Sequence, residues 1–213
     1  MHTDCNDLLK LLWQEVLFQD SYQVRNLVGR NIPVILDLGA NVGTFSILAR
    51  MLFPTARILA FEPYPPTMKL LELNTLGLGI ELYPLALGSG SPISLIDGKM
   101  PTGSGSVYGQ PEASGQTATF TLAQLLQQVG LDSLEDAIVK CDCEGGEVGL
   151  YNQSAIELLK PTTHFAAEIH GFPWAPSPSD WQRWLYWGTP RATAMVTNDP
   201  QLGLIFSRRL DRL

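Results

Sequence analysis

The feature that most constrains the fold is the stretch Ile-Leu-Asp-Leu-Gly-Ala-Asn-Val-Gly-Thr-Phe-Ser-Ile-Leu at residues 35–48. It begins as a short apolar run typical of a buried parallel strand and continues, after two glycines, with apolar residues at helical spacing. Gly39 and Gly43 are typical of a turn that backbone or a ligand approaches closely. The stretch therefore predicts a strand, a glycine turn and a helix, and we expect the turn to bind a cofactor.

The spacing of the glycines indicates the class of cofactor. In dinucleotide-binding folds the pattern is Gly-x-Gly-x-x-Gly, and its second glycine makes room for a pyrophosphate. Here the pattern is Gly-x-x-x-Gly, and Asn41 occupies the position of that second glycine. We therefore expect a cofactor without a pyrophosphate, bound at a turn made of Asp37, Gly39, Ala40, Asn41 and Gly43.

A second strand-like run, residues 57–61, ends in Glu62-Pro63, 23 positions after Gly39. An acidic residue at the end of the second strand can accept hydrogen bonds from both hydroxyls of a ribose, and its charge repels a 2′-phosphate. We therefore expect Glu62 to bind an unphosphorylated ribose.

Three segments together resemble S-adenosylmethionine-dependent methyltransferases of class I, and more narrowly the FkbM family. They are Asp37-Leu-Gly-Ala-Asn-Val-Gly43, Phe61-Glu-Pro63 and Lys140-Cys-Asp-Cys-Glu-Gly-Gly-Glu147, the last being similar to the family's Lys-Ile-Asp-Val-Glu-Gly-Ala-Glu. Two further segments match: Thr121-Leu-Ala-Gln-Leu-Leu, with Ala123 in place of the family's acid, and Glu168-Ile-His170. The resemblance extends from about residue 33 to 171.

The resemblance implies an α/β, Rossmann-like fold with a seven-stranded, mostly parallel sheet and helices on both faces. Residues 192–197 and 204–207 would form its closing antiparallel hairpin. The implied cofactor is S-adenosyl-L-methionine, with Ala86 and Leu87 against the adenine and Asp142 near the methyl group. The implied acceptor of the methyl group is an oxygen atom.

The candidate catalytic residues are Asp142, Glu144 and His170, each at the end of a predicted strand. Residues 137–143 form the fourth strand, and alternation places Lys140 and Asp142 on one face of it. A lysine on a buried strand needs a counter-charge, so we expect Lys140 in a structural ion pair. His170 follows the strand at 164–169; its imidazole titrates near neutrality, so it is either a general base or a structural histidine.

Composition limits the classes of partner. The chain has 213 residues, 14 Lys and Arg against 21 Asp and Glu, a net charge of −7 and a pI near 4.9. Nucleic-acid binding requires clustered basic residues, so we expect none. The sequence contains no apolar run of membrane-spanning length and no signal peptide, which predicts a cytoplasmic protein. We expect one domain over residues 1–213, with residues 1–30 as an N-terminal helical extension.

Two cysteines, Cys141 and Cys143, alternate along the fourth strand and share one face of it. Structural zinc sites space cysteines two to four residues apart and need further ligands. Small buried apolar side chains are the better interpretation, so we predict no metal site.

Two segments allow more than one interpretation. Residues 88–119 are rich in glycine and serine and predict either a hairpin with a mobile flap over the active site or a disordered surface loop. Trp174, Trp181, Trp184 and Trp187 lie close together in the sequence and would either line an acceptor pocket or pack on the sheet.

The function that we predict is methylation of a hydroxyl on a small-molecule acceptor, a saccharide or secondary metabolite, with S-adenosyl-L-methionine as the methyl donor. N-methylation of a small amine is the alternative reaction. A non-catalytic module that binds the adenosyl cofactor and a nicotinamide-dependent oxidoreductase are the alternatives from other classes. Fold-level analogy does not choose the acceptor.

Overall fold

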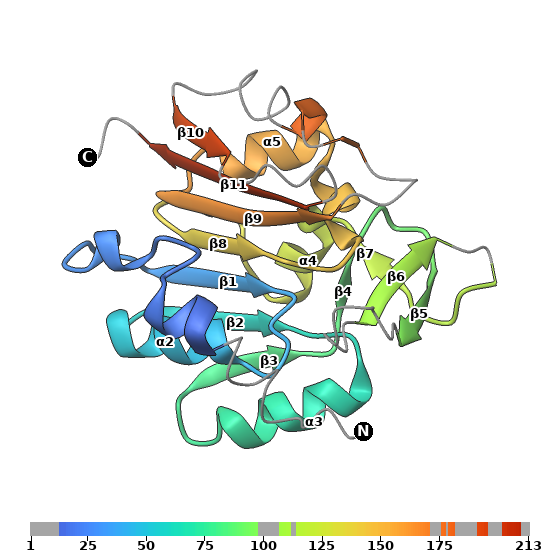
Figure 1. Cartoon of the computed structure of the whole chain (residues 1–213), viewed down its shortest axis with the longest axis horizontal. Helices are drawn as coiled ribbons and strands as arrows, with labels where there is room; N and C mark the ends of the chain where they lie inside the picture. The colour runs from blue at the N-terminus through green and yellow to red at the C-terminus, as the bar shows by residue number, and fades with distance from the viewer. Residues whose placement is uncertain are drawn as a thin grey trace.

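The computed structural model describes residues 13–97, 107–111, 114–170, 176–177, 179–181, 191–195 and 202–209. Their centre is one sheet with the strand order β10-β11-β9-β8-β1-β2-β3. The parallel strands are β1 (Val34–Leu38), β2 (Arg57–Phe61), β3 (Ile80–Tyr83), β8 (Ile138–Cys141) and β9 (His164–His170). Antiparallel β11 (Leu202–Arg209) and β10 (Arg191–Met195) complete the sheet at its upper edge in Figure 1.

Helices cover both faces of this sheet, as the Rossmann-like fold class requires (Figure 1). The α-helices are α2 (Thr44–Leu52), α3 (Pro65–Asn74), α4 (Leu122–Gln128) and α5 (Gln153–Leu159). Three shorter or irregular helices are the π-helix η1 (Trp13–Phe18) and the 3₁₀-helices η2 (Arg25–Leu27) and η3 (Gly146–Leu150).

Alternation along the strands produces the two cores. In β1, Ile35 packs with α2 on one face, whereas Leu36 packs with α4 and α5 on the other. The neighbouring strands repeat this division, because successive side chains of a strand point to opposite faces: Ile58 and Ile138 belong to the α2 core, and Leu59 and Val139 to the other. Strands buried on both faces are therefore apolar almost throughout, which is what parallel sheets require.

The N-terminal extension lies on the α2 face of the sheet. Val16, Tyr22, Val24 and Leu27 are all buried there. Within this extension, the helical spacing of Leu9, Leu12, Trp13, Val16 and Leu17 predicts an amphipathic helix over residues 7–17 with these side chains on one buried stripe. This helix lies mostly outside the described residues, and its described part belongs to the π-helix η1. Trp13 is 53% exposed, so it does not belong to the buried stripe.

Two small sheets lie beyond the carboxyl edge of the main sheet. β4 (Ala86–Leu87) pairs with β7 (Thr119–Phe120), and β5 (Ile93–Asp97) pairs antiparallel with β6 (Val107–Pro111). The β5–β6 hairpin extends to the right of the molecule in Figure 1. The segment between residues 88 and 119 therefore contains a hairpin.

Two expected boundaries differ from the structure. The fourth strand, β8, is shorter than residues 137–143, although the Asp142 backbone N–H still donates to the Leu38 carbonyl at 3.0 Å. The helical spacing of Val148, Tyr151, Ala155, Leu158 and Leu159 predicts one helix after Glu144, which in the structure is divided into η3 and α5. The break occurs because the Asn152 side chain accepts a hydrogen bond from the Ala155 backbone N–H at 2.9 Å and caps α5. No helix among the described residues is long and apolar enough to cross a membrane.

Candidate cofactor and acceptor site

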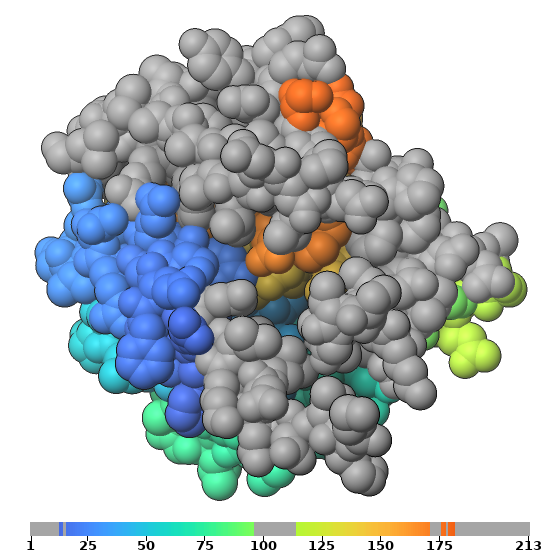
Figure 2. Space-filling model, in the orientation of Figure 1, coloured from blue at the N-terminus to red at the C-terminus, as the bar shows by residue number. Residues whose placement is uncertain are grey.

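A pocket opens at the carboxyl ends of the parallel strands, where ligands of open α/β sheets bind. Its walls come from the loops after β1, β2 and β8, from the β4 segment, and from the first strand of the hairpin. Figure 2 shows that this face of the molecule is hollowed near its centre. The pocket is lined by Leu38, Gly39, Asn41, Phe61, Glu62, Pro63, Tyr64, Thr67, Leu85, Ala86, Leu87, Ile93, Leu95, Asp142, Cys143, Glu144 and Gly146.

The glycine turn after β1 is fixed by its contact with the loop after β8. Gly39 has φ +75°, and a β-carbon at this position would lie 1.8 Å from the backbone carbonyl oxygen of Asp142. Only glycine fits both the dihedral angle and the space. The turn therefore lies directly beside Asp142, which brings two predicted site residues from distant segments together.

Glu62 lines the pocket with its carboxylate held in place. One carboxylate oxygen accepts a hydrogen bond from the Asn41 backbone N–H at 3.1 Å, and the other accepts one from the Tyr64 backbone N–H at 2.9 Å. Burial raises the pKa of Glu62, and the two N–H groups act in the opposite direction. Each oxygen of a carboxylate has a second lone pair, so Glu62 retains acceptor capacity for two hydroxyls.

Another part of the pocket wall contains Ala86 and Leu87, both buried. A β-carbon at Gly146 would lie 2.7 Å from the Leu87 carbonyl oxygen, so the turn into η3 packs directly on this wall. Ile93 and Leu95 of the hairpin add apolar surface. The wall is apolar, as the contact surface of an adenine ring requires.

Three residues of the predicted cofactor turn do not line the pocket. Gly43 packs against α3, since a β-carbon there would lie 2.8 Å from Leu71 Cδ1. Ala40 is 3% exposed and packs in the α3 core. Asp37 is fully buried beneath the turn, where it accepts a hydrogen bond from the Ser46 hydroxyl at 2.6 Å.

Lys140 is a buried structural cation, as expected. Its Nζ lies 3.2 Å from Asp37 Oδ1 and 3.8 Å from Asp142 Oδ2, and it donates a hydrogen bond to the Gly39 carbonyl at 2.6 Å. Burial acts to lower the pKa of Lys140, but Asp37 and Asp142 outweigh it and hold the pKa above its usual value. The lysine thus connects β1, the glycine turn and Asp142.

Tyr22, from the N-terminal extension, reaches the same cluster. Its hydroxyl donates a hydrogen bond to Asp142 Oδ2 at 2.9 Å, and the Lys140 ammonium lies 5.5 Å from the centre of its ring. Its backbone carbonyl oxygen lies 2.8 Å from His164 Nε2 in the core. Burial, and then the Asp142 charge, raise the pKa of Tyr22, so the hydroxyl remains a donor.

His170, at the end of β9, is surrounded by carboxylates. Its Nδ1 lies 3.1 Å from Glu147 Oε1, and its Nε2 lies 3.2 Å from Glu144 Oε2. Glu147 is 2% exposed and accepts hydrogen bonds from the Cys143 and Gly145 backbone N–H groups. Its place in the sequence indicates only a helix-dipole partner, whereas the structure shows that it orients the imidazole.

The charges around His170 bear on the general-base role expected for it. Burial acts to lower its pKa, but Glu147, Glu144 and Asp142 raise it well above the usual value. The surrounding carboxylates thus favour the protonated ring, whereas a general base needs the neutral imidazole. Glu168, on the same strand, has a pKa raised to about 8, first by burial and then by the Asp142 charge.

The cysteines and the described tryptophan have structural surroundings. Cys141 is fully buried, its Sγ lies 3.7 Å from Cys143 Sγ, and burial raises its pKa, so it is a thiol in the core. Trp181 is 1% exposed and packs edge to face on Tyr151, with ring centres 5.2 Å apart. Trp174, Trp184 and Trp187 lie outside the described residues.

Several site residues carry no signal in the sequence. Tyr22 belongs to a segment without a motif, and Ile93 and Leu95 come from a region whose composition indicates only loops and turns. The sequence could have indicated Tyr64 as a site residue, because it directly follows Glu62-Pro63 in the turn at the end of the second strand.

The chain is similar in sequence to a known methyltransferase over part of its length. No family model matches the chain. A curated relative, the methyltransferase sdnD of Sordaria araneosa, is 37% identical over 65 residues, which are 30% of this chain and 24% of that protein. The chain thus matches about a quarter of the length of this relative.

Solved structures of methyltransferases share the fold. The precorrin-6y C5,15-methyltransferase of Geobacter metallireducens superposes with a TM-score of 0.52 at 16% identity, covering 90% of this chain and 88% of that one. The methyltransferase FkbM of Methylobacillus flagellatus superposes with a TM-score of 0.52 at 14% identity, covering 83% and 43%. The chain therefore has the Rossmann-like fold of methyltransferases.

Proposed function

We propose that this chain is an S-adenosyl-L-methionine-dependent methyltransferase of the FkbM type that methylates a hydroxyl of a small molecule, a saccharide or secondary metabolite. The observation that carries the proposal is the pocket itself. It combines the carboxylate of Glu62, suited to accept the hydroxyls of a ribose, with an apolar wall and a glycine turn at the carboxyl edge of the sheet. The fold around it is that of methyltransferases. Cofactor and acceptor would meet beside Asp142.

The charge of the pocket supports this cofactor over a nicotinamide dinucleotide. Among the described residues that line it, the charged ones are Glu62, Asp142 and Glu144, and all three are acidic. A pyrophosphate needs donors and positive charge, whereas a sulfonium cofactor carries a positive charge of its own. Acidic walls therefore favour the sulfonium and oppose the diphosphate.

Each part of the pocket has a proposed role. Glu62 accepts the ribose hydroxyls, Ala86 and Leu87 contact the adenine, and the Gly39 turn leaves room for the methionyl part. Asp142 and Glu144 lie at the methyl end. When bound, the cofactor supplies a methyl group already activated for displacement.

The chain then has to align an acceptor oxygen and exclude water, which is the larger part of such catalysis. Asp142, held by Tyr22 and Lys140, provides a fixed hydrogen-bond acceptor for the acceptor hydroxyl. The proton of that hydroxyl passes to Asp142 or Glu144, the two carboxylates that line this end of the pocket. The carboxylates around His170 raise its pKa, which disfavours the neutral imidazole that a general base needs.

Calorimetric binding of S-adenosylmethionine and of NAD tests the cofactor assignment. Glu62→Gln should weaken S-adenosylmethionine binding by about 1.5–3 kcal/mol, the range for a hydrogen bond to a charged group, which is roughly 10- to 150-fold in Kd. Glu72→Gln, the same change at an exposed position of α3, is the matched control. Tighter binding of NAD than of S-adenosylmethionine by the parent protein would contradict the assignment.

A methyl-transfer assay separates the enzyme from a non-catalytic binding module. The labelled cofactor is incubated with panels of hydroxylated and amine acceptors, and the products are analysed by mass spectrometry. We expect methyl ethers. Methylated amines as the only products would favour N-methylation, and cofactor binding without transfer to any acceptor would favour the binding module.

A further inference from the structure

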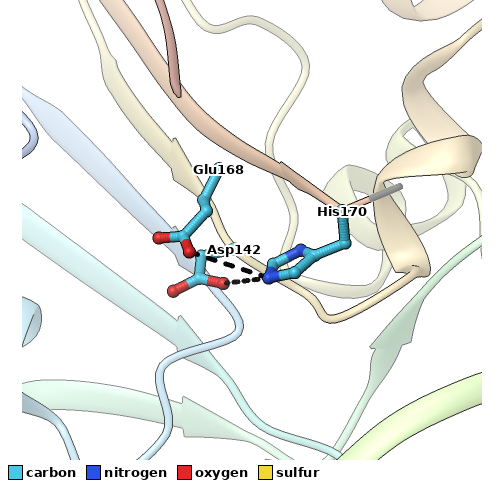
Figure 3. A group of neighbouring side chains, drawn as sticks. All are labelled: Asp142, Glu168 and His170. Atoms are coloured by element: carbon cyan, nitrogen blue, oxygen red, sulfur yellow. Dashed lines mark ion pairs between the residues drawn. The ribbon is translucent and has the colours of Figure 1, made fainter. Parts of the chain in front are cut away.

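Asp142, Glu168 and His170 converge beside the pocket (Figure 3). Asp142 follows β8 and the other two lie on β9, and one ligand-type atom from each of the three lies within 4.8 Å of the others. His170 Nε2 is 3.7 Å from Glu168 Oε1 and 4.0 Å from Asp142 Oδ1. We propose that these three side chains bind a divalent metal cation.

Two of the three side chains are held so that one defined atom faces the common centre. Asp142 Oδ2 accepts the hydrogen bond from the Tyr22 hydroxyl, which leaves Oδ1 as the atom nearest His170. The Nδ1 of His170 faces the buried Glu147, and its Nε2 therefore faces the carboxylates. Metal-binding histidines have this arrangement, with the second ring nitrogen donating to a carboxylate that fixes the ring.

The distances suit a metal after a small contraction. Neighbouring oxygen ligands of an octahedral ion at 2.0–2.1 Å are about 3 Å apart, and those of the larger Ca²⁺ are about 3.4 Å apart. The ligand atoms here would move by less than about 1 Å, a shift that side-chain torsions of Asp142 and Glu168 provide, because their side chains are 25% and 27% exposed. One imidazole with two carboxylates is a donor set for first-row divalent ions, of which Mn²⁺ is the convenient probe.

A fourth side chain strengthens the negative character of this cluster. Glu144 Oε2 lies 3.2 Å from the same Nε2 atom, so three carboxylates face one nitrogen. A divalent ion at the centre would replace these approaches by metal bonds to oxygen and nitrogen.

The consequence for the acceptor rests on the proposed function. Asp142 lines the pocket, so the ion would lie at its methyl end. A bound ion with open coordination positions lowers the pKa of a hydroxyl that it contacts and orients it. It would favour acceptors with two adjacent oxygen donors, such as a vicinal diol, over a lone alcohol. The acceptor oxygen then forms the bond to the methyl carbon, the carbon–sulfur bond breaks, and the hydroxyl proton leaves to a carboxylate or to water.

The test is Mn²⁺ binding to the full chain after treatment with a chelator, without any cofactor, followed by calorimetry and pulsed electron paramagnetic resonance. We expect one saturable site and a coupling between the ion and a histidine nitrogen. Glu168→Gln should weaken binding by 10-fold or more, and His170→Gln should also abolish the nitrogen coupling. Glu157→Gln, the same change at an exposed acid of α5, should leave binding unchanged.

Three results would overturn the proposal: no saturable Mn²⁺ binding by the parent protein, equal binding by the folded Glu168→Gln variant, or a bound ion without nitrogen coupling. Thermal melting shows whether each variant is folded, and Asp142→Asn replaces any variant that is not. S-adenosylmethionine binding is measured in parallel. Cofactor binding without Mn²⁺ binding refutes the metal site alone, whereas Mn²⁺ binding without cofactor binding refutes the proposed function alone.

Discussion

Replacing Lys140 by methionine tests whether the buried ion pair organises the candidate site. The Lys140 side chain is 4% exposed and that of Asp37 is fully buried, with 3.2 Å between Nζ and Oδ1. Methionine is similar in length and carries no charge, so Asp37 would keep only the hydrogen bond from the Ser46 hydroxyl. Breaking a buried pair by removing one partner costs about 3–5 kcal/mol, because the other charge remains buried.

The measurement is urea unfolding followed by circular dichroism, with thermal melting beside it. For a chain of this size, a loss of about 3–5 kcal/mol corresponds to a decrease in Tm of roughly 6–20 °C. The matched control is Lys160→Met, at a position on the surface where the lysine pairs with Glu157, and its effect should be small because exposed ion pairs contribute little.

A second variant makes the test specific for the charge. Lys140→Met combined with Asp37→Asn removes the carboxylate that the first change leaves without a cation, so the double variant should be more stable than Lys140→Met alone. If the single variant loses less than about 1 kcal/mol, or if the double variant is no more stable, the pair does not have the role assigned to it.

Three further predictions concern the same region. The pKa values of Glu168 and His170 are raised in the folded chain, so the stability that these groups contribute is present at low pH and is lost as pH rises. Tm should therefore fall between about pH 5 and 9, and Glu168→Gln should make this fall less steep. An unchanged slope of Tm against pH would contradict the prediction. Tyr22→Phe removes the hydrogen bond to Asp142 and should reduce turnover, measured as methyl transfer per folded molecule, with little change in Tm. Unchanged turnover would show that the Tyr22 hydroxyl has no role in the site. Gly39→Ala should lower Tm more than Gly77→Ala, because the two positions have φ of +75° and +78° but only Gly39 lacks room for a methyl group; equal effects would show that the contact is not rigid.

Gly39 also shows where sequence reasoning reaches the right residue by an incomplete argument. The sequence assigns Gly39 to cofactor contact, because glycine turns after a first strand commonly approach a ligand. In the structure, the backbone of Asp142 already requires a glycine at position 39, because its carbonyl oxygen lies 1.8 Å from the position that a β-carbon would occupy. A bulky residue there would therefore disturb the fold before it disturbed binding.

Apolar runs predicted the parallel strands well, because strands buried on both faces must be apolar and their carboxyl ends must share one edge. The same reasoning puts Glu62, Asp142 and His170 at that edge, because each lies at or just after the end of a strand. Contacts between distant segments were not predictable in the same way. No local pattern indicates that Tyr22 crosses to Asp142, or that Glu147 turns inward to His170 and not outward to solvent.

Electrostatic roles were the least predictable part of the site. A histidine at a strand end is a reasonable general base at its ordinary pKa, and the sequence offers no measure of how many carboxylates surround it. The helix η3 and the segment after β8 bring Glu147, Glu144 and Asp142 to one imidazole at the end of β9. The protonation state thus follows from tertiary packing, and the same packing creates the candidate metal site.

The hairpin of β5 and β6 begins and ends at one place on the pocket wall. The Gly88 backbone N–H donates to the Phe120 carbonyl at 2.9 Å, and the Gly90 N–H donates to the Thr119 hydroxyl at 3.0 Å, so the two ends of the segment are joined before the hairpin starts. A loop closed at its base tolerates changes of length at little entropic cost. The segment can therefore be exchanged as a unit, which would change the apolar surface that Ile93 and Leu95 add to the pocket while the part of the wall made by Ala86 and Leu87 stays unchanged.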